Sequence, residues 1–133
     1  MAAPSLVVID HEEARVFQSL VPGTEPLKIL AAPVPTSTGS AIPFLPRNPP
    51  SREYLEAIVQ AISNADTIQI YGCGPNSGPE VNALKTWLET HYFDLALRVV
   101  ATQIAPDRFW SNSRFLTQGR NELAKQAHAL IAS

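Results

Sequence analysis

Short apolar runs separated by polar or proline-containing breaks occupy the first thirty residues, a pattern that predicts strands. The run from Leu6 to Ile9 is continuously apolar and rich in β-branched residues, as in a strand covered on both faces. Residues Ala14 to Leu20 alternate enough to pair back on it as an antiparallel strand, and Leu27 to Leu30 reads as a third strand. Three strands are therefore expected before any helix.

The rest of the chain is expected to alternate between helices and strands. After Ser51, apolar residues recur with the spacing of one helix face, and Ser51 itself suits the cap position. Further elements are predicted as a strand at Ile68 to Tyr71, a helix from Ser77 to about His91, a strand within Leu95 to Ile104 around Leu97 to Ala101, and a helix from about Phe115 to Ala132. This order, βββαβαβα, predicts one three-layer α/β domain of residues 1–133 with a mixed five-stranded sheet and helices on both faces.

A proline-rich stretch interrupts this pattern between the third strand and the first helix. Residues Pro33 to Pro50 hold six prolines together with Ser, Thr and Gly, which suits neither a helix nor an inner strand. Loops of this length in a compact domain are uncommon and are usually either functional or disordered. The stretch has one basic residue, Arg47.

The turn from Gly72 to Gly78 joins a predicted strand to a predicted helix, and Ser77 and Glu80 have the spacing of a capping box. Backbone N–H groups at a helix start can hold a phosphate or carboxylate, so the candidate ligand-binding residues are Gly72, Gly74, Asn76, Ser77 and Gly78. Neither nucleotide-binding fingerprint, GxGxxG or GxxxxGK[ST], is present. A tight connection that needs glycine for its backbone geometry is the favoured interpretation.

Cys73 and the acidic cluster Asp10 to Glu13 are the other candidates for chemistry. Cys73 is interpreted as a buried inert thiol rather than as a nucleophile, and as the single cysteine it excludes an intrachain disulfide. Acids and a histidine can ligate a metal or move protons, but adjacent residues on a hairpin turn point in different directions. A solvated turn is favoured, so no metal and no cofactor is expected.

Charge limits the classes of partner. The formal charge of −2 and the pI near 5.9 argue against a protein that holds nucleic acid mainly by phosphate neutralisation. A local contact patch is still available, in which arginines flank two aromatic residues that can stack on bases; its members are Arg47, Arg52, Arg108, Phe109, Trp110 and Arg114. The alternative is that these arginines lie at the rim of core aromatic residues.

Location and self-association follow from the apolar pattern. The first residues lack the basic and apolar segments of a secretion signal, and no apolar run approaches the roughly 18 residues of a membrane span. The chain is therefore expected in the cytoplasm without a membrane partner. An apolar sheet edge near the second or the fifth strand would suit a homodimer.

Four short pieces of the sequence carry a family resemblance. They are Val8 to Asp10, the alternating Ala14 to Phe17, Ile62 to Asp66 before the fourth strand, and Gly72-x-Gly74 before a polar helix start. Together they resemble the middle domain of the archaeal and eukaryotic peptide-release-factor and Pelota family, and small bacterial proteins related to that domain. The resemblance spans about Leu6 to Ile131 and implies the ribonuclease-H-like fold of translational machinery components.

The resemblance also bears on function. In release factors the loop before the first helix carries a Gly-Gly-Gln tripeptide that hydrolyses peptidyl-tRNA, and Pro33 to Pro50 has none. The Pelota branch, which binds ribosomes without that tripeptide, is the better analogy. A ribonuclease-H-like nuclease is rejected because the fourth strand ends at Tyr71 and Gly72, without the acid that a two-metal site needs.

The expected function is therefore a noncatalytic binding module related to translation, with the ribosome or tRNA as partner and with no catalytic residues. The alternative is a small-molecule- or anion-binding protein, or a small enzyme, that uses the turn from Gly72 to Gly78.

Overall fold

The structure, a computed structural model, describes residues 4–31, 51–107 and 109–132, and the side chains of the last helix up to Gln126. The predicted loop from Pro33 to Pro50 with its Arg47 lies outside the described residues, and so does Arg108. In chain order the elements are β1 (Pro4–Ile9), β2 (Glu13–Phe17), β3 (Leu27–Leu30), α1 (Arg52–Ile62), β4 (Thr67–Gly72), α2 (Gly78–His91), α3 (Phe93–Ala96), β5 (Val99–Ile104) and α4 (Asn112–Ala132).

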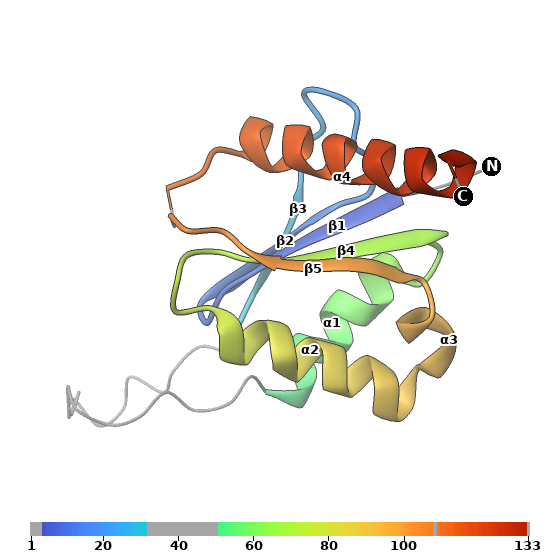
Figure 1. Cartoon of the computed structure of the whole chain (residues 1–133). Coiled ribbons are helices and arrows are strands. Elements are labelled where there is room, and N and C mark those ends of the chain that lie inside the picture. Colours follow the sequence, from blue (N-terminus) through green and yellow to red (C-terminus); the bar gives the residue numbers. More distant parts are fainter. Residues whose placement is uncertain (1–3, 32–50, 108, 133) are drawn as a thin grey trace, which may run out of the picture.

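The five strands form one mixed sheet in the order β3-β2-β1-β4-β5. β1 and β2 form the predicted antiparallel hairpin, with Val7 opposite Val16, and β3 continues it. β4 lies parallel to the other side of β1, with Val7 opposite Ile70, and β5 lies parallel to β4. Helices α1, α2 and α3 cover one face of the sheet and α4 covers the other (Figure 1). The predicted three-layer α/β architecture is confirmed.

Each face of the sheet has its own apolar cluster. Val7, Ile9, Ile68 and Ile70 of the central strands face α1 and α2, which bury their apolar stripes against them. Neighbouring residues of the same strands face α4. The two central strands are buried on both sides, as the continuous apolar run in β1 predicts.

A buried polar contact positions α4 on the sheet. The side-chain amide of Gln69 donates a hydrogen bond to the Gly119 carbonyl at 3.0 Å, and the Tyr71 hydroxyl donates to Gln69 Oε1 at 2.6 Å. A Cβ atom at Gly119 would lie 2.7 Å from Leu6 Cδ1. Because Gly119 has no side chain, the backbone of α4 can approach β1 and β4 directly.

Several predicted element boundaries are wrong. β2 ends at Phe17 rather than Leu20, because the chain turns at residues 21–24, where Thr24 N donates to Val21 O and Gly23 has φ +85°. The last helix begins three residues before the predicted Phe115. The Ser111 hydroxyl oxygen accepts the N–H of Arg114 there and caps the first turn.

The fifth strand was predicted to include Leu97 and Arg98, which lie outside it. Residues Phe93–Ala96 form the short helix α3, and Arg98 N donates to Leu95 O at 2.9 Å as the chain leaves that helix. A single helical turn is too short to show a periodic apolar pattern, which is why the sequence did not reveal it.

Sheet order also decides which strands have a free edge. β2 lies between β1 and β3, so the expectation of an apolar edge at the second strand is wrong. β5 is an edge strand, as the alternative expectation required. None of the helices in the described part of the chain is both long and apolar enough to cross a membrane.

The close approach at Gly119 predicts a specific loss of stability. Gly119→Val would push a branched side chain into the buried Leu6, and overpacking of this kind lowers the free energy of unfolding by about 1–3 kcal/mol. Ala124→Val, at an exposed position of the same helix, is the matched control for the lower helix propensity of valine. Urea denaturation of both variants measures the difference, and equal losses would contradict the proposed contact.

Candidate functional site

The turns that follow β1 and β4 lie next to each other at one edge of the sheet. β1 and β4 are parallel neighbours, so their carboxyl ends at Ile9 and Gly72 coincide. The chain leaves β1 toward β2 on one side and leaves β4 toward α2 and β5 on the other. In open α/β sheets, ligands bind where neighbouring strands diverge in this way.

A hollow of about 220 Å³ lies between these two turns, and we call it the rim cleft. Its described walls are Asp10, His11, Glu12, Cys73, Gly74, Pro75, Asn76, Ser77, Glu80 and Phe109. Four of the predicted ligand-binding residues flank or line it, since Gly74, Asn76 and Ser77 are in its wall and Gly72 begins the turn. The structure therefore brings the glycine turn and the acidic cluster together.

Backbone geometry accounts for two glycines of the turn. Gly74 has φ +94°, in the left-handed region that favours glycine. A Cβ atom at Gly72 would lie 2.9 Å from Ser77 Cβ, so with any other residue at position 72 the two ends of this turn could not lie as close together as they do. At Gly78 an added Cβ would make only an ordinary contact of 3.5 Å with Ile104 Cδ1. The interpretation as a tight strand-to-helix connection agrees with this geometry.

The predicted capping box at the start of α2 is wrong. Ser77 occupies the cap position, but its side chain makes no cap hydrogen bond and its hydroxyl donates to Gly74 O at 2.6 Å. The Ser77 side chain therefore closes the glycine turn and does not cap α2. Glu80, the other member of the box, is buried with 3% of its surface exposed.

The charges around the rim cleft are mainly negative. Asp10, Glu12 and Glu80 bring three carboxyl groups to its walls, and the described wall residues include no Lys or Arg. The imidazole of His11 lies 3.4 Å from both the Asp10 and the Glu12 carboxylates. This charge is unfavourable for a phosphate or carboxylate ligand, so the geometry does not favour the anion-binding alternative.

A second hollow of about 290 Å³ adjoins the rim cleft on the α4 side of the sheet. Its described walls are Val8, Asp10, Glu13, Arg15, Cys73, Phe109 and Trp110. Asp10, Cys73 and Phe109 line both hollows. The two hollows therefore adjoin each other at the carboxyl ends of the strands, and we call the pair the depression.

Arg15 is the basic residue among the described walls of this second hollow, and it is not among the site residues predicted from the sequence. Its guanidinium donates hydrogen bonds to Asn112 Oδ1 and, at 3.6 Å, to Cys73 Sγ, and its Cζ lies 5.2 Å from the centre of the Phe115 ring. The alternation of residues along β2 does indicate its position. Ala14 and Val16 point into the core on the α1 and α2 side of the sheet, so Arg15 between them must point to the α4 side.

Burial raises the pKa of the Cys73 thiol, and the Arg15 guanidinium beside it offsets part of this effect. A raised pKa keeps the thiol protonated near neutral pH, and the thiolate is the reactive form. This agrees with the interpretation of Cys73 as an inert thiol, but the prediction that it is buried is wrong, since the residue is half-buried and lines both hollows.

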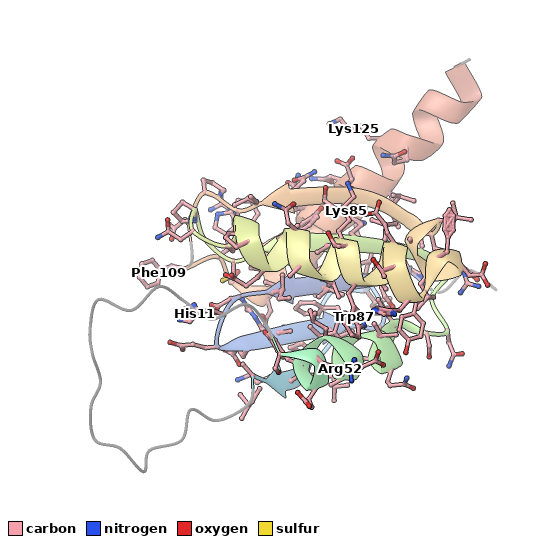
Figure 2. All side chains as sticks on the ribbon, turned by 90° about the horizontal axis from the view of Figure 1, so that it is seen from below. His11, Arg52, Lys85, Trp87, Phe109 and Lys125 are labelled. Carbon is pink, nitrogen blue, oxygen red and sulfur yellow. The ribbon has the colours of Figure 1, made fainter. Side chains whose placement is uncertain are left out.

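The predicted aromatic pair occupies two different environments. Phe109 is 84% exposed, whereas Trp110 is half-buried against Phe115 with ring centres 5.3 Å apart. Arg114 places its Cζ 4.2 Å from the centre of the Trp110 ring. Phe109 and His11 lie at the same end of the molecule (Figure 2).

Arg52 does not join this group. It lies on α1, where its Cζ is 6.0 Å from the centre of the Trp87 ring of α2, on the face of the sheet opposite α4 (Figures 1 and 2). Glu56, also on α1, accepts hydrogen bonds from Trp87 Nε1 at 3.0 Å and from the Tyr92 hydroxyl at 2.7 Å. The predicted contact patch is therefore divided between two faces.

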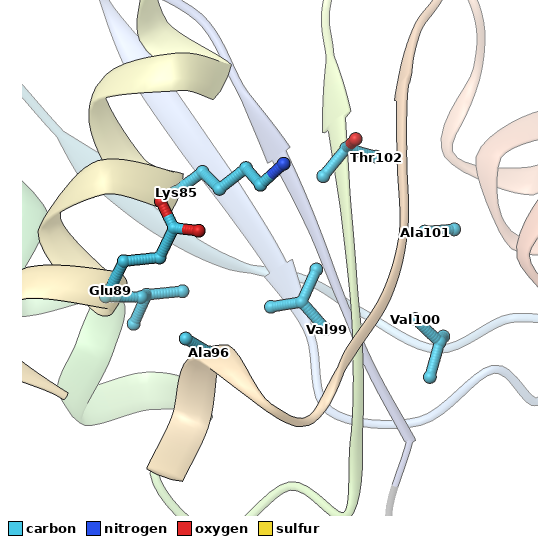
Figure 3. Close-up of a pocket in the computed structure, with 8 residues that line it drawn as sticks. Lys85, Glu89, Ala96, Val99, Val100, Ala101 and Thr102 are labelled. Atoms are coloured by element: carbon cyan, nitrogen blue, oxygen red, sulfur yellow. The ribbon is translucent and has the colours of Figure 1, made fainter. Parts of the chain in front are cut away.

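A third hollow, of about 230 Å³, lies between α2, α3 and the edge strand β5 (Figure 3). Lys85 and Glu89 stand on its α2 side and residues 99–102 form the β5 side. It contains none of the predicted site residues. On the other face, the side-chain amide of Gln126 donates to Val100 O at 3.3 Å, so α4 reaches part of the same edge.

The Arg15 contact predicts how the Cys73 thiol titrates. Arg15→Gln removes a positive charge that lowers the pKa of the thiol, so this pKa should rise further and alkylation by iodoacetamide should need higher pH. Below the pKa, each unit of increase slows alkylation about tenfold. The midpoint of the rate-against-pH curve is the measurement, since it is independent of access to the thiol. Arg120→Gln, on α4, is the control, and an unchanged midpoint in Arg15→Gln would contradict the assignment.

Comparison with known proteins supports the fold. No protein-family model and no curated protein matches the sequence. The crystal structure of the Thermoplasma acidophilum Pelota protein is similar, with a TM-score of 0.50 and 15% sequence identity over 90% of this chain. This chain corresponds to 38% of the length of that Pelota chain.

The likeness to Pelota confirms the predicted α/β arrangement of helices around a mixed five-stranded sheet. The resemblance to the Pelota family is thereby supported in structure. The further likeness to small bacterial proteins stays a prediction. At 15% identity the comparison concerns the fold, and the chain is similar to one part of Pelota in its backbone arrangement.

Proposed function

We propose that the chain is a cytoplasmic, noncatalytic binding module related to translation, which associates with the ribosome or with an RNA such as tRNA. The observation that carries the proposal is the Pelota-like fold, which spans 90% of this chain. Binding rather than catalysis is favoured because burial raises the pKa of the Cys73 thiol and so keeps it in its less reactive, protonated form.

Contact with RNA phosphates is best placed on α4 and the connection before it. Among its described residues 112–126, α4 carries Arg114, Arg120 and Lys125 against one acid, Glu122. Arg114 above the Trp110 ring adds a flat cationic surface on which a base can stack. Arg47 and Arg108 remain predicted contacts, whereas Arg52 lies on the other face and is left out.

The alternative function, an anion- or small-molecule-binding protein or small enzyme at the glycine turn, has weaker support. The turn faces the rim cleft, whose three carboxyl groups oppose an anion. The predicted homodimer would pair through β5, the one predicted edge that the sheet leaves open. Both remain predictions.

The proposed α4 contact predicts a change in the salt dependence of RNA binding. Each lost phosphate contact lowers the slope of log K against log salt concentration by about one, so Arg114→Ala combined with Lys125→Ala should lower it by about two. The assay is a titration of tRNA by the whole chain at several salt concentrations, followed by co-sedimentation with ribosomes. Lys85→Ala, which removes an exposed lysine from α2, should leave both results unchanged.

Two results would contradict the proposal. If the unaltered chain neither shifts tRNA at low salt nor co-sediments with ribosomes, the proposed function is wrong. If it binds but the α4 double variant and Lys85→Ala behave alike, the assignment of the contact to α4 is wrong.

The effect of phosphate on thermal stability distinguishes the proposed function from the glycine-turn alternative. With three carboxyl groups around the rim cleft, phosphate at constant ionic strength should leave the Tm of the chain where chloride leaves it. Thermal denaturation in matched phosphate and chloride buffers, and with added nucleotides, makes the comparison. A rise in Tm that Asn76→Ala abolishes would instead support anion binding at the turn.

A further inference from the structure

The rim cleft and Phe109 are left unused by the contact proposed for α4. At about 220 Å³ the cleft is smaller than the roughly 300–1,000 Å³ of sites for cofactors and other drug-sized ligands. It has room for one long side chain. A site of this size at diverging strand ends suits a residue presented by another protein.

Phe109 is the strongly exposed apolar side chain among the described walls of this depression. It is the most exposed of the large apolar side chains in the described part of the chain, and it lines both the rim cleft and the second hollow. The face of an aromatic ring attracts a cation, and its edge and carbon atoms accept the methylene stem of a lysine or arginine.

The carboxyl groups come from separate elements that the sheet holds together. Asp10 and Glu12 belong to the turn after β1, and the hydrogen bond from Glu12 N to Asp10 Oδ1, 2.8 Å long, orders that turn. Tyr54 of α1 donates its hydroxyl to the Asp10 carbonyl at 2.8 Å and so ties the turn to a helix. Glu80 enters from the first turn of α2. The carboxyl groups are therefore held in place by the ordered turn after β1 and by helices α1 and α2.

The described positive groups nearby are already engaged. Arg15, in the second hollow, is bound to Asn112 and Cys73 and stacks on Phe115. His11 lies between two carboxylates. None of these contacts removes the charge of Arg15, but among the described wall residues Asp10, Glu12 and Glu13 outnumber it, so the depression favours a cationic occupant over the phosphates of RNA.

We propose that the rim cleft binds a lysine or arginine side chain from a basic segment of a partner protein, with its charge toward Asp10 and Glu12 and its stem against Phe109. The second hollow adjoins the cleft and carries the two carboxyl groups of Asp10 and Glu13 against the one guanidinium of Arg15, so it receives a second basic side chain of the same segment. Alternate residues of an extended chain point to the same side, about 7 Å apart. A segment with basic residues at positions i and i+2 can therefore present both of them to the two adjoining hollows. This docking surface goes beyond the proposed function and does not depend on it.

The test is binding of a fluorescent peptide to the whole chain, measured by anisotropy. The probe is a serine- and glycine-rich peptide with lysines at alternate positions, and its matched control is the same peptide with the lysines acetylated, which removes their charge. The chain should bind the lysine peptide and bind the acetylated one at least about tenfold more weakly.

Two variants locate the binding. Phe109→Ala and Glu12→Gln change exposed side chains, and each should weaken binding about tenfold while leaving the Tm unchanged. Glu89→Gln removes an exposed acid from α2, away from the cleft, and should have no effect. Equal weakening by Glu89→Gln would show attraction by net charge alone and would overturn the proposal.

Other results would also overturn it. These are no binding of the lysine peptide, equal binding of the acetylated peptide, or binding that persists in both cleft variants. Competition by tRNA that is lost in Phe109→Ala and Glu12→Gln would assign the cleft to RNA instead. Because ribosomes are absent from this assay, its failure leaves the ribosome experiment on α4 unaffected.

Discussion

The parallel pairing of β1 with β4 is the constraint on which the rest of this structure depends. It runs in register from Pro4 opposite Thr67 to Ile9 opposite Gly72 and joins the amino-terminal hairpin unit to the β4–α2–β5 unit. Both strands are buried on each face, so the pairing is flanked by the two apolar clusters. Since parallel strands end at the same edge, it also places the acidic turn beside the glycine turn. The rim cleft is a direct consequence of strand order.

A buried polar contact gives the other face of the sheet its alignment. Apolar packing alone would allow a long helix to slide or rotate on a sheet, because such contacts are not directional. The hydrogen bonds that link Tyr71, Gln69 and the Gly119 carbonyl are directional and buried, so they specify one position. The absence of a side chain at Gly119 makes the short distance possible. The position of α4 in turn brings Asn112 and Phe115 to Arg15.

Charge is distributed unevenly over this framework. The net charge is −2, yet the described part of α4 carries Arg114, Arg120 and Lys125 against one acid, whereas the described walls of the rim cleft carry carboxyl groups and no Lys or Arg. Phe109 lies within the acidic depression, while the neighbouring Trp110 pairs with Arg114. One module of this size can therefore offer a phosphate and a basic protein segment two different surfaces. Total charge excludes neither partner, because attraction between charges is local at physiological salt.

The sequence by itself determined the order in which the strands and longer helices follow one another along the chain, the class of fold and the need for glycine at the strand-to-helix turn. These features depend on the spacing of apolar residues and on backbone sterics, which act over a few neighbouring positions, as in the run Leu6 to Ile9 and at Gly72. Only the tertiary structure decided that Ser77 bonds Gly74 rather than caps α2, that Arg15 reaches Cys73, and that Arg52 lies apart from Arg114. It also decided that the acidic turn meets Glu80 and Phe109 in one cleft. Apart from the local bond between Ser77 and Gly74, these arrangements involve residues far apart in the chain, and they arise from sheet order and register, which local patterns of polarity do not encode.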